Sequence, residues 1–150
     1  MKKIYLDSCF VIYLVERVEP FSSLITNAFA KNINSIFCIS PLVRLEVLVY
    51  PMRNNDRDLT KNYEDFLAEL EVLSITDKVF DQALQLRVAH GLKTPDALHF
   101  ATAMVYGCNE FWTNDDRLSK VAGSISINLF NDLADVSGGG DSAKPTLGER

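Results

Sequence analysis

The chain has 150 residues, of which 47% are hydrophobic and 23% are charged, a composition typical of one globular domain. No apolar run approaches the roughly 18 residues that a membrane-spanning helix needs, and the first residues do not form a secretion signal. We therefore expect a cytoplasmic protein with no membrane segment. The net charge of −5 argues against a broad basic surface for nucleic acid, but it is compatible with an acidic site that binds cations.

The three cysteines, Cys9, Cys38 and Cys108, are widely spaced and embedded in apolar sequence. An odd number of cysteines without short spacings is not the pattern of a disulfide framework or of a cysteine metal site. We expect them to be small core residues.

The spacing of apolar residues predicts short strands separated by helices. The strands are expected at residues 2–6, 35–39, 72–75, 110–113 and 124–129. The helices are expected at residues 9–16, 20–31, 41–50, 60–70, 77–90, 94–106 and 116–121.

This alternation of strands and helices predicts one α/β domain over residues 1–136. Its central, mostly parallel sheet would have four to five short strands flanked by about seven helices. The glycine-rich stretch that begins at Ser137 predicts a flexible tail over residues 137–150.

The expected helix at 41–50 begins at Ser40 and Pro41 and is apolar nearly all round. We expect it to be buried on most faces and to end at Pro51. Glu46 is the exception, and Arg44 lies on a different face and is a poor local partner. A carboxylate in such a setting must be paired, protonated or bound to a metal, and a distant Lys or Arg would serve as well as a metal.

The helix expected from residue 94 begins with Thr94 as its N-cap and Pro95 as its first helical residue. Asp96 then lies in the first turn, where the positive end of the helix dipole favours its ionised form. Taken alone, Asp96 is a helix-start charge. His99 follows on a nearby face of the helix, and we favour a packing or supporting role for it over that of a general base.

Acids also follow two of the predicted strands, because Asp7 comes after the first and Asp115 after the fourth. If those strands are neighbours, their carboxyl ends bring the two acids together, and Asp96 and Glu46 could flank the same crevice. Oxygen ligands without nearby Cys or His suit Mg²⁺ or Mn²⁺. The residues alone leave two alternatives open, a metal site or a set of helix caps and surface charges.

Four segments in this order resemble PIN-domain ribonucleases, and in particular the VapC-type toxins of type II toxin–antitoxin pairs. The resemblance covers residues 2 to about 130, and the segment around Asp96 is its most specific part. The segments are Tyr5-Leu6-Asp7-Ser8, Arg44-Leu45-Glu46, Leu92 to Ala103 and Trp112-Thr113-Asn114-Asp115.

The resemblance implies a PIN-like fold in which four acids bind Mg²⁺ or Mn²⁺ and cleave RNA internally. It assigns this catalytic and metal-binding role to Asp7, Glu46, Asp96 and Asp115. It also implies a homodimer and inhibition by a cognate antitoxin protein. Residues that could support the site are Ser8, Thr113, Asn114, Asp116 and His99, with Asp116 better explained as a solvated helix-start acid. Candidate phosphate contacts are Arg53, Arg57, Lys93 and Arg117.

Two other functions remain open on the sequence. A phosphatase of the haloacid dehalogenase kind also has an Asp after its first strand, but it needs a second Asp two residues later, where this chain has Cys9. A PIN-like binding or scaffold module would keep the fold without cleavage. The presence of all four acids counts against that alternative.

Overall fold

Five parallel strands form one sheet in the computed structural model, which describes residues 1–127. The elements are β1 (Lys3–Leu6), α1 (Ser8–Val15), α2 (Phe21–Lys31), β2 (Ile36–Ile39), α3 (Pro41–Arg53), α4 (Arg57–Leu67), β3 (Glu71–Val72), α5 (Asp77–His90), α6 (Thr94–Val105), β4 (Glu110–Trp112), α7 (Asp116–Ala122), a 3₁₀ turn (Gly123–Ile125) and β5 (Ser126–Ile127). The α/β class, the parallel sheet and the order of elements are confirmed. The predicted tail at 137–150 and the end of the last predicted strand lie outside the described residues.

The strand order is β3-β2-β1-β4-β5, with β1 in the centre. The chain builds the sheet outward from β1 through β2 and β3, and then returns to place β4 on the other side of β1. In this second pairing Leu6 lies opposite Trp112, so the two strands end side by side. Open α/β sheets bind their ligands at such a switch point, beyond the carboxyl ends of the strands.

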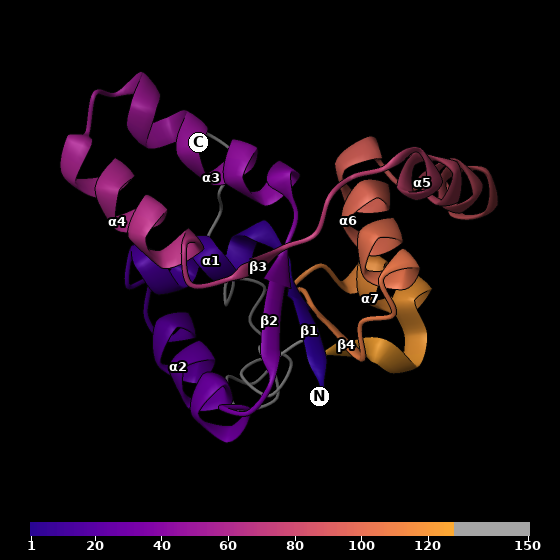
Figure 1. The fold of residues 1–150 in the computed structure, drawn as a ribbon, viewed down its shortest axis with the longest axis horizontal. Helices are drawn as coiled ribbons and strands as arrows, with labels where there is room; N and C mark the ends of the chain where they lie inside the picture. Colours follow the sequence, from indigo (N-terminus) through magenta and orange to yellow (C-terminus); the bar gives the residue numbers. More distant parts are fainter. Residues whose placement is uncertain (128–150) are drawn as a thin grey trace, which may run out of the picture.

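Helices cover both faces of the sheet. Figure 1 shows α1, α2 and α4 on one side and α6 and α7 on the other, with α5 packed on the outside of α6. Because β1 is covered on both faces, it reads as a continuous apolar run, and its residues Ile4, Tyr5 and Leu6 are fully buried. On β4, Phe111 and Trp112 are buried with them, which confirms Trp112 as a core residue.

Helix α3 is less buried than its sequence predicts. Leu45 and Met52 keep about 60% of their surface exposed (61% and 60%), and Val49 and Tyr50 are also exposed. The helix packs against α1 and α4 through residues such as Val43 and leaves its opposite side open. The expectation of burial on most faces is therefore wrong, because an apolar sequence does not by itself supply neighbours.

Two predicted helix ends also differ. Pro51 does not end α3, which continues to Arg53; Pro51 is buried in the last turn, and Asn54 still donates its backbone N–H to the carbonyl of Tyr50. A proline removes its own N–H but does not prevent the next residues from closing their bonds. At the start of α6, Lys93 takes the cap position and Thr94 is the first helical residue, one position earlier than predicted.

Other expectations are met. Cys9, Cys38 and Cys108 are buried and free. Gly91 ends α5 in the left-handed conformation, with φ of 64°, where a residue without a side chain is favoured. Within residues 1–127 no helix combines the length and apolar character that crossing a bilayer requires.

Candidate active site

Asp7 and Asp115 each cap a helix that follows one of the two neighbouring strands. Asp7 precedes α1, and its Oδ1 accepts the backbone N–H of Ser8 at 2.8 Å. Asp115 precedes α7, and its Oδ1 accepts the backbone N–H of Leu118 at 3.1 Å. The free N–H groups of a helix start bind a carboxylate oxygen, so both acids are oriented at the same end of the sheet.

Thr113 connects these two acids. Its side chain is fully buried, its Oγ1 donates to Asp7 Oδ2 at 2.8 Å, and the same oxygen accepts the backbone N–H of Asp115 at 3.1 Å. The neighbouring Asn114 instead donates its side-chain amide to the hydroxyl of Tyr13 on α1, at 2.8 Å. Thr113 therefore orients Asp7 and the backbone of Asp115 at once.

Glu46 reaches the same place from α3. Its Oε1 accepts hydrogen bonds from Ser8 Oγ at 2.9 Å and from His99 Nε2 at 2.5 Å. Burial acts to raise the pKa of Glu46, but the hydrogen bonds from His99 and Ser8 outweigh it and lower the pKa. The partner of Glu46 is thus a histidine with a serine, while Arg44 pairs with Glu64 on α4.

Asp96 is the acid without a partner of its own. It lies half-buried in the first turn of α6 and makes no hydrogen bond or ion pair with residues 1–127. Its pKa is raised, first by burial and then by the negative charges of Asp7, Asp115 and Glu46, with His99 acting in the opposite sense. Asp7, Asp115 and Glu46, which are distant from Asp96 in the sequence, therefore each lie within electrostatic range of Asp96.

The supporting residues predicted from the sequence separate into two groups. Ser8 and Thr113 each hydrogen-bond one of the four acids, whereas the side chain of Asn114 bonds Tyr13 on α1. His99 Nε2 hydrogen-bonds Glu46 and also lies 3.8 Å from Asp7 Oδ1. Asp116 is exposed in the first turn of α7. Sequence reasoning missed Tyr5 and Ser40, which are buried and hydrogen-bonded behind His99. Neither residue carries a local signal, because one lies inside a strand and the other looks like an ordinary helix cap.

The carboxylate oxygens of the four acids are ligands that suit a hard cation such as Mg²⁺, but they do not surround a common point in this structure. No group of three or more His, Cys, Asp or Glu side chains in residues 1–127 is arranged as a ready-made metal site. Asp96 has no hydrogen-bond or ion-pair partner within residues 1–127 and its pKa is raised, so it is the acid whose negative charge a divalent cation would stabilise most.

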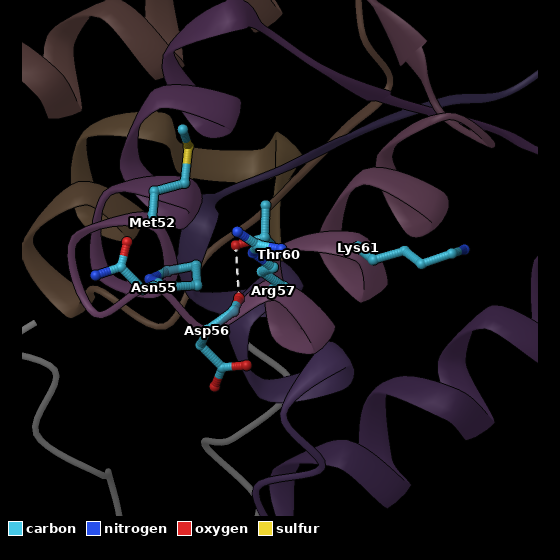
Figure 2. A pocket seen from close by; sticks show the side chains of 7 residues that line it. Met52, Asn55, Asp56, Arg57, Thr60 and Lys61 are labelled. Atoms are coloured by element: carbon cyan, nitrogen blue, oxygen red, sulfur yellow. Dashed lines mark hydrogen bonds between the residues drawn. The ribbon is translucent and has the colours of Figure 1, made fainter.

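A small cavity of about 160 Å³ adjoins this cluster, with Asp96 and Asp115 in its wall. Lys93 and Arg117 also line it, and Arg117 donates to the carbonyl of Gly91 at 3.1 Å. A larger cavity of about 340 Å³ lies at the turn between α3 and α4, where Figure 2 shows its lining side chains. None of the four acids lines that second cavity.

Comparison with known proteins places this chain in a family. The sequence model of the PIN domain matches residues 4–124. Comparison with curated protein sequences yields no significant match.

Similar solved structures include VapBC2 of Rickettsia felis, bound to a DNA fragment from its promoter, at 17% identity and a TM-score of 0.71, covering 84% of this chain and 98% of that chain. VapBC of Salmonella typhimurium, also bound to DNA, has 22% identity and a TM-score of 0.64, and the match covers 85% of this chain and 98% of that chain. VapC20 of Mycobacterium tuberculosis, a toxin that cleaves the sarcin-ricin loop, has 18% identity and a TM-score of 0.67, and the match covers 79% of this chain and 94% of that chain. At these identities the likeness concerns the fold. The family model covers most of the chain, and this protein therefore belongs to the PIN-domain family.

Proposed function

We propose that this protein is a Mg²⁺- or Mn²⁺-dependent endoribonuclease and the toxin of a VapBC-type toxin–antitoxin pair. Its family and its VapC-like fold support the broader statement that it is a nuclease. The observation that carries the finer proposal is the carboxylate of Asp96, which has no hydrogen-bond or ion-pair partner among residues 1–127. Its pKa is raised first by burial and then by the charges of Asp7 and Asp115, at the ends of β1 and β4, and of Glu46 on α3. Such a cluster costs stability unless a cation is bound.

In the proposed site Asp7, Glu46 and Asp96 would hold the cation, and Asp115 would hold a second one or orient the attacking water. A bound Mg²⁺ or Mn²⁺ would polarise the phosphodiester and lower the pKa of the attacking water. Thr113 fixes Asp7, and Ser8 fixes Glu46, so both carboxylates are already oriented. Lys93 and Arg117 stand beside the acids, where a phosphate of the substrate could be contacted.

RNA as substrate and an antitoxin as partner are supported by the structural neighbours, among which one cleaves the sarcin-ricin loop and others are toxin–antitoxin complexes. The proposal includes a cytoplasmic location.

A homodimer is supported by two apolar helix faces that are exposed in a single chain. One is the open side of α3 described above. The other is the stripe of Phe80, Leu84 and Val88 on α5, exposed at 53%, 58% and 76%. Residues four apart lie on one side of a helix, so this stripe is continuous. Exposed apolar surface of this kind marks an interaction site.

The test is RNA cleavage by the purified protein and by an Asp7→Asn, Asp96→Asn double variant, with Mg²⁺ or Mn²⁺ supplied. We expect the wild type to cleave and the double variant to be inactive while remaining folded by circular dichroism. Undiminished cleavage by the folded double variant would falsify the assignment of these acids.

The scaffold alternative makes a different prediction. A module that keeps the fold but binds no metal would show no change in melting temperature at millimolar Mg²⁺ or Mn²⁺, whereas clustered carboxylates gain stability when a divalent ion binds. The phosphatase alternative predicts hydrolysis of small phosphate esters instead of RNA. The residue two positions after Asp7 is a buried cysteine, Cys9, which cannot supply the second carboxylate of that chemistry.

A further inference from the structure

A chain of buried hydrogen bonds runs behind Glu46. His99 is 1% exposed, and its Nε2 lies 2.5 Å from Glu46 Oε1. Its other ring nitrogen, Nδ1, lies 2.7 Å from the hydroxyl of Tyr5, which in turn lies 2.8 Å from Ser40 Oγ. Tyr5 and Ser40 are both fully buried, so water does not compete for these bonds.

This chain links the elements that carry three of the four acids. Tyr5 belongs to β1, just before Asp7, and His99 lies one turn after Asp96 on α6. Ser40 precedes α3, the helix of Glu46, and makes no cap bond with its side chain. The hydroxyl of Ser40 is hydrogen-bonded to Tyr5 and does not cap α3.

The hydrogen bonds to Glu46 reach only one of its two carboxylate oxygens among residues 1–127. Its carboxylate can only accept, so His99 Nε2 must carry the proton that it donates; in the neutral ring Nδ1 then accepts from Tyr5. Ser8 and His99 both reach Oε1, and no hydrogen bond from residues 1–127 reaches Oε2. Within residues 1–127, therefore, Oε1 of Glu46 is hydrogen-bonded twice and Oε2 has no hydrogen-bond partner.

We infer that His99 is a positioning residue, which holds Oε1 of Glu46 so that Oε2 is presented to the cation. This inference rests on the function proposed above. Tyr5 and Ser40 fix the ring of His99, because a histidine held at one nitrogen alone could rotate or change tautomer. Residues that hold metal ligands in this way typically contribute 10-fold to 100-fold to metal affinity.

The experiment measures Mn²⁺ affinity by calorimetry on metal-stripped protein, together with kcat and KM for RNA cleavage. His99→Leu removes the donor, Tyr5→Phe removes only the support of the ring, and His99→Gln keeps an N–H that can reach Glu46. We expect His99→Leu to weaken Mn²⁺ binding by about 10-fold to 100-fold and Tyr5→Phe by less. His99→Gln should restore most of the affinity, and KM for RNA should change little in all three.

His90→Gln is the matched control, since His90 is the other histidine of the chain and lies exposed at the end of α5. A purely structural role predicts lower melting temperatures with unchanged Mn²⁺ affinity in the His99 and Tyr5 variants, and that result overturns the inference. If His99→Leu does not fold, Tyr5→Phe and His99→Gln decide the question by the same criterion. A wild type that binds neither Mn²⁺ nor Mg²⁺ would instead overturn the proposed function.

Discussion

The N-terminal turns of α5 and α6 have similar sequences and different surroundings. Each has a threonine at its start and an aspartate in its first turn, Thr76 with Asp77 and Thr94 with Asp96. On α5, Thr76 accepts the backbone N–H of Val79, and Asp77 is exposed. On α6, Thr94 makes no side-chain hydrogen bond with the described residues, while Asp96 is half-buried and repelled by three other acids.

The difference lies in what each turn faces. The start of α5 faces solvent, so its acid serves the helix dipole and nothing else. The start of α6 points to the ends of β1 and β4, where Asp7 and Asp115 already stand. The same local pattern therefore becomes a stability feature in one place and a candidate ligand in the other, and four predictions test this distinction.

The largest expected effect is on cleavage. Asp96→Asn should lower metal-dependent RNA cleavage by about 100-fold or more, because losing a ligand should exceed the effect of losing its support. Asp77→Asn is the matched control, with the same substitution in the first turn of α5, and it should cleave like the wild type. Initial rates at saturating Mg²⁺ provide the measurement, and equal losses in both variants would contradict the comparison.

The next effect is the stabilisation by metal. At a concentration 100 times its dissociation constant, a bound ion stabilises the folded protein by about 2.7 kcal/mol. Thermal unfolding should therefore move to clearly higher temperature when Mn²⁺ is added to the wild type and to Asp77→Asn, and much less in Asp96→Asn. An equal shift in all three proteins would mean that the ion binds elsewhere.

A smaller effect concerns pH in the metal-free protein. The pKa of Asp96 is raised from its ordinary value of 3.8, so the folded state binds this proton more tightly than the unfolded state does. Protonation of Asp96 therefore adds to the free energy of unfolding at low pH, and this contribution is lost as the pH rises from about 3.8 through the raised pKa of Asp96. Metal-free Asp96→Asn should thus be more stable than the wild type at pH 7, with the advantage disappearing below pH 3.8. A constant difference across that range, measured by urea unfolding, would argue against the repulsion.

The smallest effect is on the helix caps. Thr76→Ala removes a cap bond from α5 and should lower the free energy of unfolding by about 0.5–1 kcal/mol. Thr94→Ala removes no such bond within residues 1–127 and should leave it nearly unchanged. Urea unfolding of both variants measures the difference, and similar losses would show that the two starts are capped alike.

The sequence predicted the fold better than it predicted burial. The apolar runs and helix starts identified every strand and α-helix among residues 1–127, with shifts of a few residues at their ends. They missed the 3₁₀ turn at Gly123–Ile125, part of which was assigned to the last strand. Helix α3 was misjudged, because Leu45 and Met52 are apolar yet exposed. Hydrophobicity indicates that a side chain favours burial, but whether a neighbour covers it depends on how the helices are arranged.

The candidate site shows the same division. Asp7, Glu46, Asp96 and Asp115 could be named from the sequence by their places and by the family resemblance, and their catalytic role stays a prediction. The sequence alone determined the alternation of strands and helices and the acids at their ends, because both depend on local spacing. Only the tertiary structure decided that β1 and β4 are neighbours and that His99, Tyr5 and Ser40 stand behind Glu46. Those contacts join residues far apart in the chain, and they form only when the sheet brings its elements together.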